Sequence, residues 1–295
     1  MTPSAQTYSR NIETARLKLP GSWKGIAALQ INGSTFQKND WNISLRHPEL
    51  LFENTEKILK TDGSNSVAVK NFTIAGSQFK VVVKRNYPTT NLRQIFRSLQ
   101  PAKSFTNFQT ALKLTNCQIP VVVPLAALYR RSNLLTKQSI YITEYCPNST
   151  NVYAFAFEHF SKHSADNLAL KKQLCRLLAE TLASLHQNGF WHRDSKATNF
   201  IVCPDQQGKY KIFLTDLDGI KPYFLSRSNR RFSSLWRLAA SLMSIEGINR
   251  TDYFRAFKIY CDITGLEPAK RKETFRQLVH LAETKHLLST LKNRQ

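Results

Sequence analysis

Two polar motifs in the second half of the chain constrain its fold more than any other feature. The first runs from His192 to Asn199 as His-Arg-Asp-Ser-Lys-Ala-Thr-Asn, and the second, residues 216–219, reads Asp-Leu-Asp-Gly. Between them, apolar segments 200–202 and 210–214 flank a turn-forming Asp-Gln-Gln-Gly sequence. This pattern predicts a β-hairpin that returns the second motif to the first. The fold must therefore bring the two motifs together.

The residue types in these motifs are those of magnesium-assisted phosphoryl transfer. The first motif matches the kinase catalytic loop His-Arg-Asp-x-x-x-x-Asn at every specified position. In that chemistry Asp194 orients an acceptor hydroxyl and takes its proton, while Asn199 and Asp216 hold Mg²⁺ against the phosphates of ATP. Lys196 is placed to offset charge on the γ-phosphate as its bond breaks. Asp218 is either an additional metal carboxylate or the cap of the next turn.

The first half of the chain contains a candidate phosphate-binding lysine. Segments 57–60, 67–72 and 79–84 are rich in β-branched residues and predict three strands joined by short turns. Lys84 closes the third strand and resembles the strand lysine of kinases, which holds the α- and β-phosphates. The turn before it has only one glycine, but its backbone N–H groups are suited to cradle phosphate. We expect four residues of this turn to contact the nucleotide: Thr61, Asp62, Gly63 and Ser64.

The next predicted helix lacks a glutamate that kinases usually have. Apolar residues recur at helical spacing over residues 104–114. Kinases pair the strand lysine with a glutamate on this helix, but no Asp or Glu lies between Lys84 and Glu144. We expect Asn107 to take that position, with a neutral hydrogen bond in place of the ion pair.

Two further strands and a hinge complete the first half. Residues 121–123 and 139–143 are β-branched or apolar and predict strands. The polar, proline-containing stretch 144–148 follows and predicts a hinge, where we expect Glu144 and Cys146 to contact the nucleotide.

The second half is predicted to be mainly helical. An apolar stripe over 174–185, followed by Gly189, predicts a buried helix that leads directly into the first motif. Further helices are predicted at about 232–244, 253–263 and 269–291. The fold class expected is α+β: one two-lobed, protein-kinase-like domain spanning 1–295. Its expected parts are an N-terminal extension (1–55), a small β-rich N-lobe (56–145) and a mostly helical, shortened C-lobe (146–295).

The chain is strongly basic. It has 42 Lys and Arg against 20 Asp and Glu, a net charge of +22, so anionic partners are expected: nucleic acid, an acidic membrane surface or a phosphorylated ligand. No nucleic-acid-binding motif accompanies this charge, which disfavours nucleic acid. The five cysteines are scattered and indicate a reducing compartment. No signal peptide or membrane-spanning segment is predicted.

Together these residues resemble the lipopolysaccharide kinase family, the Kdo and core-heptose kinases. The resemblance covers about Lys57–Gly265 and depends on Leu185-His186, on the stretch Gly189–Asp194, on Asn199 and on the Asp-Leu-Asp form of the second motif. It implies ATP and Mg²⁺ as cofactors and phosphorylation of a Kdo or heptose hydroxyl in the inner core of lipopolysaccharide. It also implies a cytoplasmic enzyme, peripheral on the cytoplasmic face of the inner membrane. The sequence carries no signal for an oligomeric state.

An anionic glycolipid needs cationic contacts near the acceptor. Three arginines follow the second motif and are candidates for carboxylate or phosphate contacts, with a solvated basic loop as the alternative: Arg227, Arg230 and Arg231.

Three other functions remain open. A protein kinase would use the same motifs, but no Ala-Pro-Glu element follows them. A small-molecule kinase of the antibiotic-phosphorylating type usually has a cationic acceptor, which suits an acidic pocket better than this chain. A catalytically inactive, kinase-shaped binding module is favoured by the missing helix glutamate and disfavoured by the intact Asp194, Asn199 and Asp216.

Overall fold

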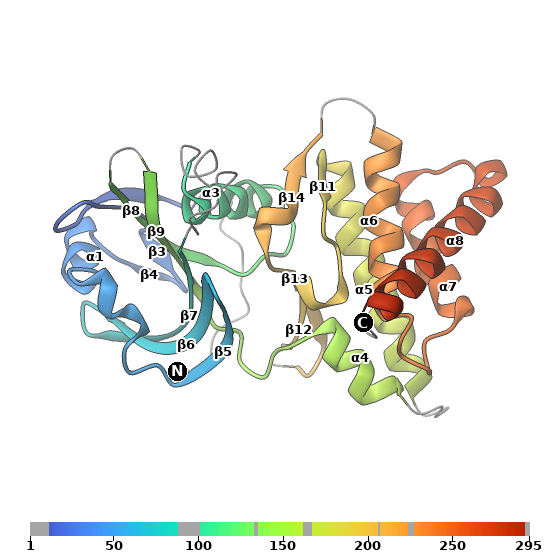
Figure 1. Cartoon of the computed structure of the whole chain (residues 1–295), viewed down its shortest axis with the longest axis horizontal. Coiled ribbons are helices and arrows are strands. Elements are labelled where there is room, and N and C mark those ends of the chain that lie inside the picture. Colours follow the sequence, from blue (N-terminus) through green and yellow to red (C-terminus); the bar gives the residue numbers. More distant parts are fainter. Residues whose placement is uncertain are drawn as a thin grey trace. The chain divides into compact units, whose positions relative to one another are not determined.

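The chain folds into two compact units in the computed structural model, Met1–Cys146 and Pro147–Gln295 (Figure 1). The residues described are 12–87, 101–132, 135–161, 167–205, 207–223 and 227–292. The boundary between the units falls within the stretch 144–148, where the sequence predicted a hinge.

A seven-stranded antiparallel sheet forms the first unit (Figure 1). In spatial order its strands are β1 (Thr14–Lys18), β2 (Trp23–Ala28), β8 (Pro124–Ser132), β9 (Leu135–Glu144), β7 (Ser77–Asn86), β6 (Asn65–Ile74) and β5 (Lys57–Asp62). The strands predicted at 57–60, 67–72, 79–84 and 139–143 are confirmed within β5, β6, β7 and β9.

The strand predicted at 121–123 was wrong. Val121 forms only an isolated bridge, and the strand β8 begins at Pro124. Val121 is fully buried, which explains the apolar run without a strand. Proline is tolerated as the first residue of a strand because it lacks only the N–H donor.

Residues expected to form an N-terminal extension are built into the first unit. β1 and β2 extend the sheet, and β2 pairs with β8 from Trp23↔Arg130 to Ala27↔Ala126. Four short elements complete the segment: β3 (Gln30–Ile31), β4 (Ser34–Thr35), α1 (Lys38–Ser44) and the 3₁₀ helix η1 (Pro48–Phe52). Elements this short give little periodicity in a sequence.

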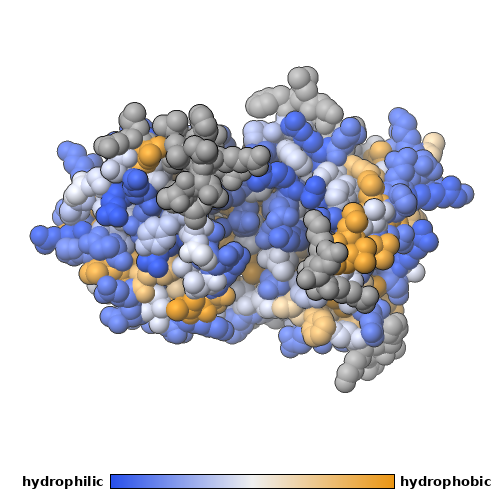
Figure 2. Space-filling view, in the orientation of Figure 1, coloured by the Kyte–Doolittle hydropathy of each residue, from blue (hydrophilic) through white to orange (hydrophobic). Residues whose placement is uncertain are grey.

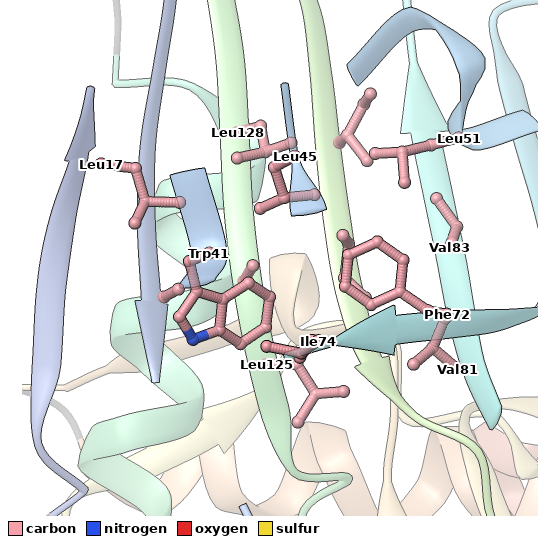
Figure 3. Close-up of a cluster of buried hydrophobic side chains, with 14 of the residues drawn as sticks. Leu17, Trp41, Leu45, Leu51, Phe72, Ile74, Val81, Val83, Leu125 and Leu128 are labelled. Atoms are coloured by element: carbon pink, nitrogen blue, oxygen red, sulfur yellow. The ribbon is translucent and has the colours of Figure 1, made fainter. Parts of the chain in front are cut away.

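One face of this sheet packs on a large apolar core (Figure 3). Trp41 of α1 is fully buried there, and its indole N–H donates to the carbonyl of Ala28 at 2.9 Å. Val81 and Val83 of β7 point into this core, as the period-two alternation of a strand requires. On β9, Tyr141 instead packs with Phe108 of α3 (Lys103–Asn116), the helix predicted at 104–114.

The second unit is mainly helical, as predicted. Its helices are α4 (Val152–Phe160), α5 (Leu168–Gln187), α6 (Arg227–Leu242), α7 (Arg250–Thr264) and α8 (Pro268–Lys292). Small sheets join β10 (Thr150–Asn151), β12 (Phe200–Pro204) and β13 (Tyr210–Leu214), and pair β11 (Phe190–His192) with β14 (Ile220–Pro222). The sequence did not predict α4. Over the described ranges, no helix is long and apolar enough to cross a membrane.

A buried carboxylate joins α5 to α7. Asp252 is 5% exposed, and its Oδ1 lies 2.5 Å from a guanidinium nitrogen of Arg255. Its Oδ2 lies 3.5 Å from Nζ of Lys171, on α5, and accepts the backbone N–H of Asn249 at 3.2 Å. The two cations offset the desolvation of the carboxylate. Because Lys171 lies on α5 and Asp252 on α7, their contact links the two helices.

Candidate active site

The two polar motifs lie together at the ends of the β12–β13 hairpin. The first motif begins on β11 and ends in the 3₁₀ turn η3 (Ala197–Asn199), directly before β12. The hairpin pairs Phe200 with Leu214, and β13 leads into the 3₁₀ turn η4 (Leu217–Gly219) and β14. The predicted return of the second motif to the first is thus confirmed.

Three hydrogen bonds join the two motifs and shape the first. Arg193 N–H donates to the carbonyl of Gly219 at 2.7 Å, and Thr215 N–H donates to the carbonyl of Asn199 at 2.9 Å. Asn199 Nδ2 also donates to the carbonyl of Asp194 at 2.7 Å. The backbone positions of Asp194 and Asn199 are therefore coupled.

His192 organises the loop from inside. Its ring is fully buried, and Nδ1 accepts the backbone N–H of Asp194 at 3.2 Å. Burial lowers the pKa of His192 to about 4, against opposing effects from Asp216 and Asp194. The ring is therefore neutral at pH 7, with its proton on Nε2. A buried, neutral ring that is bonded to the loop backbone is suited to position the loop rather than to react.

Gly219 is required by the approach of this ring. A Cβ atom at Gly219 would lie 2.6 Å from Cε1 of His192 and 2.7 Å from its Nδ1. Real Cβ atoms do not approach other atoms so closely, so the last residue of the second motif is a glycine for packing reasons.

Helix α6 fixes the loop from the other side, through serines that the sequence analysis did not single out. Ser234 Oγ lies 3.2 Å from the backbone N and 3.1 Å from the carbonyl of His192. Ser195 Oγ donates to the carbonyl of Ser234 at 2.6 Å, and Ala197 N–H donates to Ser241 Oγ at 2.8 Å. Ser234 and Ser241 are two helical turns apart, so they share one face of α6. The only sequence signal was a pair of serines at heptad spacing on one predicted helix.

Asp194 and Lys196 keep their charged ends accessible. Asp194 Oδ2 lies 3.2 Å from Nζ of Lys196, and the two side chains are 47% and 52% exposed. The loop backbone is thus buried and hydrogen bonded while its two charged groups remain able to meet a substrate.

Asn199 and Asp216 present the oxygen donors that Mg²⁺ prefers. Since Nδ2 of Asn199 is committed to the carbonyl of Asp194, Oδ1 is the amide atom suited to a cation. Asp216 has φ 50° and ψ 56°, a left-handed conformation that costs energy at a residue other than glycine. This pair fits a magnesium ion. The structure does not distinguish the two roles considered for Asp218.

The three candidate arginines differ. Arg231 Nε donates to the hydroxyl of Tyr223 at 2.7 Å and a terminal nitrogen donates to the carbonyl of His186 at 3.1 Å, so this guanidinium braces α5 and α6. The guanidinium of Arg230 lies 5.5 Å from the centre of the Trp191 ring. The side chain of Arg227 lies outside the described residues.

The same brace contains a second buried histidine. Nδ1 of His186 lies 2.8 Å from the hydroxyl of Tyr260, and the Tyr223 hydroxyl donates to the His186 carbonyl. Burial, followed by the nearby Arg231 charge, lowers the pKa of His186 to about 3. Tyr223 N–H also bonds the carbonyl of Gly189 at 3.0 Å, which fixes the entry to β11.

In the first unit, Lys84 lies on the face of the sheet that carries α3. It is directly opposite Tyr141 in the β7–β9 register, and opposite residues of an antiparallel pair share a face. Tyr141 packs against Phe108 of α3. The neighbour of Phe108, Asn107, is buried, but within the described part of the chain its Oδ1 has no hydrogen-bond partner. The expectation that Asn107 Oδ1 accepts a neutral hydrogen bond in place of the kinase ion pair was therefore wrong.

The predicted phosphate-binding turn is shorter than expected. Thr61 and Asp62 end β5, so only Gly63 and Ser64 form the connection to β6, and Gly63 has φ 45°. Glu144 ends β9 and accepts a hydrogen bond from Asn32 Nδ2 at 2.7 Å, and Cys146, a free cysteine, follows.

This architecture is that of the protein-kinase-like fold. A structure described as WaaP in complex with acyl carrier protein superposes with a TM-score of 0.59 and 18% identity, covering 84% of this chain and 96% of that one. The BubR1 kinase domain gives 0.47 and 14%, covering 80% and 82%. No curated protein matches in sequence.

The family of this chain is shown by a match to a protein-family model. Residues 67–260 match the lipopolysaccharide kinase (Kdo/WaaP) family, and the chain belongs to that family. It is therefore a kinase, and the substrate class of its family is lipopolysaccharide.

Proposed function

We propose that this protein transfers the γ-phosphate of ATP to a Kdo or heptose hydroxyl of the lipopolysaccharide inner core. The observation that carries this proposal is the hydrogen-bonded joining of the two motifs, which holds Asp194 and Asn199 in one backbone unit beside the 216–219 turn. Family membership supplies the substrate class. The particular sugar comes from the resemblance.

In this mechanism Asp194 accepts the proton of the sugar hydroxyl. The sugar oxygen forms a bond to the γ-phosphorus, the bond from that phosphorus to the β–γ bridging oxygen breaks, and ADP leaves. Nζ of Lys196 lies 3.2 Å from the Asp194 carboxylate, which places it beside the base. From there it would offset negative charge on the transferred phosphoryl group.

The remaining parts bind ATP and the cation. Asn199 and Asp216 would hold Mg²⁺, which neutralises phosphate charge when bound. Lys84 would contact the α- and β-phosphates. The turn residues Thr61–Ser64 would contact phosphate through backbone N–H groups, and Glu144 and Cys146 would contact the base.

The basic surface suits an anionic, lipid-anchored acceptor. Each Lys or Arg close to an anionic membrane contributes on the order of 1 kcal/mol to binding. With a net charge of +22, we propose that the protein works as a peripheral enzyme on the cytoplasmic face of the inner membrane. Arg230 remains a candidate for acceptor contacts. Arg231 is a weaker candidate for acceptor contacts, because two of its N–H donors bond to Tyr223 and His186.

The test is phosphate transfer from labelled ATP to purified core-truncated lipopolysaccharide with Mg²⁺. A generic protein substrate runs in parallel. The Asp194→Asn variant should lower label in the glycolipid roughly 10²–10⁴-fold, whereas Asp262→Asn, which changes an exposed carboxylate of the same unit, should retain it. Label only in protein would identify a protein kinase instead.

A catalytically inactive binding module is the second candidate, favoured by a non-acidic residue on α3, Asn107, whose Oδ1 has no hydrogen-bond partner among the described residues. Nucleotide binding with Mg²⁺, measured by thermal stabilisation, should disappear in Asp216→Ala under either function. Binding without transfer to glycolipid or protein would favour the inactive module.

A further inference from the structure

Helix α8 has apolar residues on two opposite faces. Leu278, Val279 and Ala282 are buried against the rest of the second unit, where α8 packs mainly on α6. The larger side chains toward its carboxyl end are instead exposed to solvent. These exposed leucines and their exposed fractions are Leu281 39%, Leu287 63%, Leu288 54% and Leu291 60%.

The exposed leucines form one stripe, here called the α8 leucine stripe (Leu281, Leu287, Leu288 and Leu291). At about 100° per residue, they fall within an arc of about 120°, centred nearly opposite the buried face. In Figure 2, apolar side chains gather over the carboxyl-terminal part of α8. A stripe of this kind exceeds the scattered single apolar residues that are normal on a protein surface.

Cationic residues accompany the stripe. The α8 sequence contains six Lys and Arg residues and two Glu residues. Arg276 and Lys285 are both exposed and lie on either side of the stripe by the same helical geometry, with the exposed Glu283 beside Arg276. An exposed apolar stripe flanked by cations is the pattern of a helix that lies in the interface of an anionic membrane.

The charge of the chain distinguishes a membrane from a second copy as the occupant. Two molecules with a net charge of +22 would repel each other if these helices met face to face. An anionic lipid surface attracts the same charges and accepts the leucines into its apolar region. The family acts on lipopolysaccharide, a membrane glycolipid, which makes such a surface available.

We propose that the α8 leucine stripe docks this protein onto an anionic membrane surface, lying in the plane of the interface. The choice of an anionic lipid as partner rests on the proposed function, whereas the docking surface rests on α8 alone.

The experiment measures binding of the full chain to vesicles by co-sedimentation. Wild-type protein should bind vesicles of phosphatidylglycerol and phosphatidylethanolamine, bind phosphatidylcholine vesicles weakly, and lose affinity as salt rises. The triple variant Leu287→Ser, Leu288→Ser, Leu291→Ser should lower the partition coefficient roughly tenfold or more. All three side chains are exposed, so the fold should persist, which circular dichroism verifies.

The control removes three exposed apolar side chains elsewhere, 66%, 43% and 46% exposed: Ile43→Ser, Leu50→Ser and Leu168→Ser. It should bind vesicles as the wild type does. Equal binding by both triple variants would overturn the proposal. So would a wild-type dimer, seen by light scattering, that the stripe variant converts to a monomer, because the stripe would then be covered by a second copy.

Failure of the proposed function gives a different pattern. Vesicle binding needs no phosphate transfer, so Asp194→Asn should bind vesicles normally while losing activity. A protein that binds vesicles through the stripe but never phosphorylates glycolipid would overturn the proposed function alone.

Discussion

The catalytic loop of the second unit and the predicted nucleotide-binding segments of the first unit are built differently. Around the loop, Nδ1 of His192 and the hydroxyls of Ser195 and Ser234 are buried and hydrogen bonded, so backbone and side chains fix one another, while Nε2 of His192 has no partner among the described residues. The β5–β6 connection is a two-residue turn in which Gly63 is exposed and Ser64 half-buried. On the helix facing the Lys84 side of the sheet, Asn107 Oδ1 accepts no hydrogen bond within the described residues.

This difference follows from the chemistry proposed for each region. Proton transfer needs Asp194 within hydrogen-bonding distance of one hydroxyl, so its loop requires a rigid support. Phosphates are held by charge and by backbone N–H groups, which tolerate more variation in side chains. Substituting the polar groups buried around the loop should therefore lower turnover and stability more than substituting those of the first unit.

The largest expected effect is on the loop carboxylate. Asp194→Asn keeps the shape of the side chain but removes the base, so turnover should fall roughly 10²–10⁴-fold while ATP still binds. Steady-state transfer to core-truncated lipopolysaccharide and nucleotide thermal shift measure the two quantities. Asp262→Asn is the control and should stay near wild type. Turnover unchanged by Asp194→Asn would remove this residue from the mechanism.

The two buried histidines predict a loss of stability in acid. Because burial lowers the pKa of His192 from 6.5 to about 4 and that of His186 from 6.5 to about 3, the unfolded chain binds more protons than the folded protein in this range. Their contribution is complete above about pH 6.5 and is lost as pH falls toward the folded values, at about 1.4 kcal/mol per pH unit for each ring.

The free energy of unfolding, measured with urea at several pH values between 4.5 and 7, should therefore depend more steeply on pH in wild type than in His186→Gln. The difference in this slope should correspond to about one proton. His280→Gln, which removes an exposed histidine of the same unit, is the matched control. Identical slopes for all three proteins would contradict a neutral, buried His186.

The α6 support of the loop gives a smaller effect on stability. Ser234→Ala leaves the backbone N–H and carbonyl of His192 without that hydroxyl and should cost about 1–3 kcal/mol in the free energy of unfolding. It should also lower kcat more than it changes the KM for ATP, because it displaces the loop. Neighbouring Ser233 bonds only Arg237 among the described contacts, so Ser233→Ala should cost less than about 0.5 kcal/mol.

The smallest effect is expected on α3. Asn107→Leu replaces an amide whose buried oxygen is unpaired, so the free energy of unfolding should change by less than about 1 kcal/mol. The KM for ATP should change less than about threefold, since no bond from this oxygen supports Lys84. Ser104, on the same helix, donates to the carbonyl of Leu128 at 2.8 Å, so Ser104→Ala should cost about 1–2 kcal/mol. A large loss of ATP affinity in Asn107→Leu would show that both regions depend equally on buried polar side chains.

The sequence by itself determined the parts of the protein that depend on local patterns. The strands β5, β6, β7 and β9 follow from β-branched and apolar segments bounded by turns, and the helices α3, α5, α6, α7 and α8 follow from apolar residues at helical spacing. The return of the second motif follows from the turn between β12 and β13. The acidic and amide residues of the two motifs were identified in the same way, because their spacing is set by the hairpin.

Only the tertiary structure decided which distant groups meet. Ser234 and Ser241 support the catalytic loop, Gly219 admits the ring of His192, and Arg231 braces α5 rather than standing free for a substrate. Residues 14–52 belong to the first unit because β2 pairs with β8, a strand far along the chain. Such contacts join residues that are separated in sequence and unremarkable in composition, so no local periodicity encodes them, and packing selects them when the chain closes on itself.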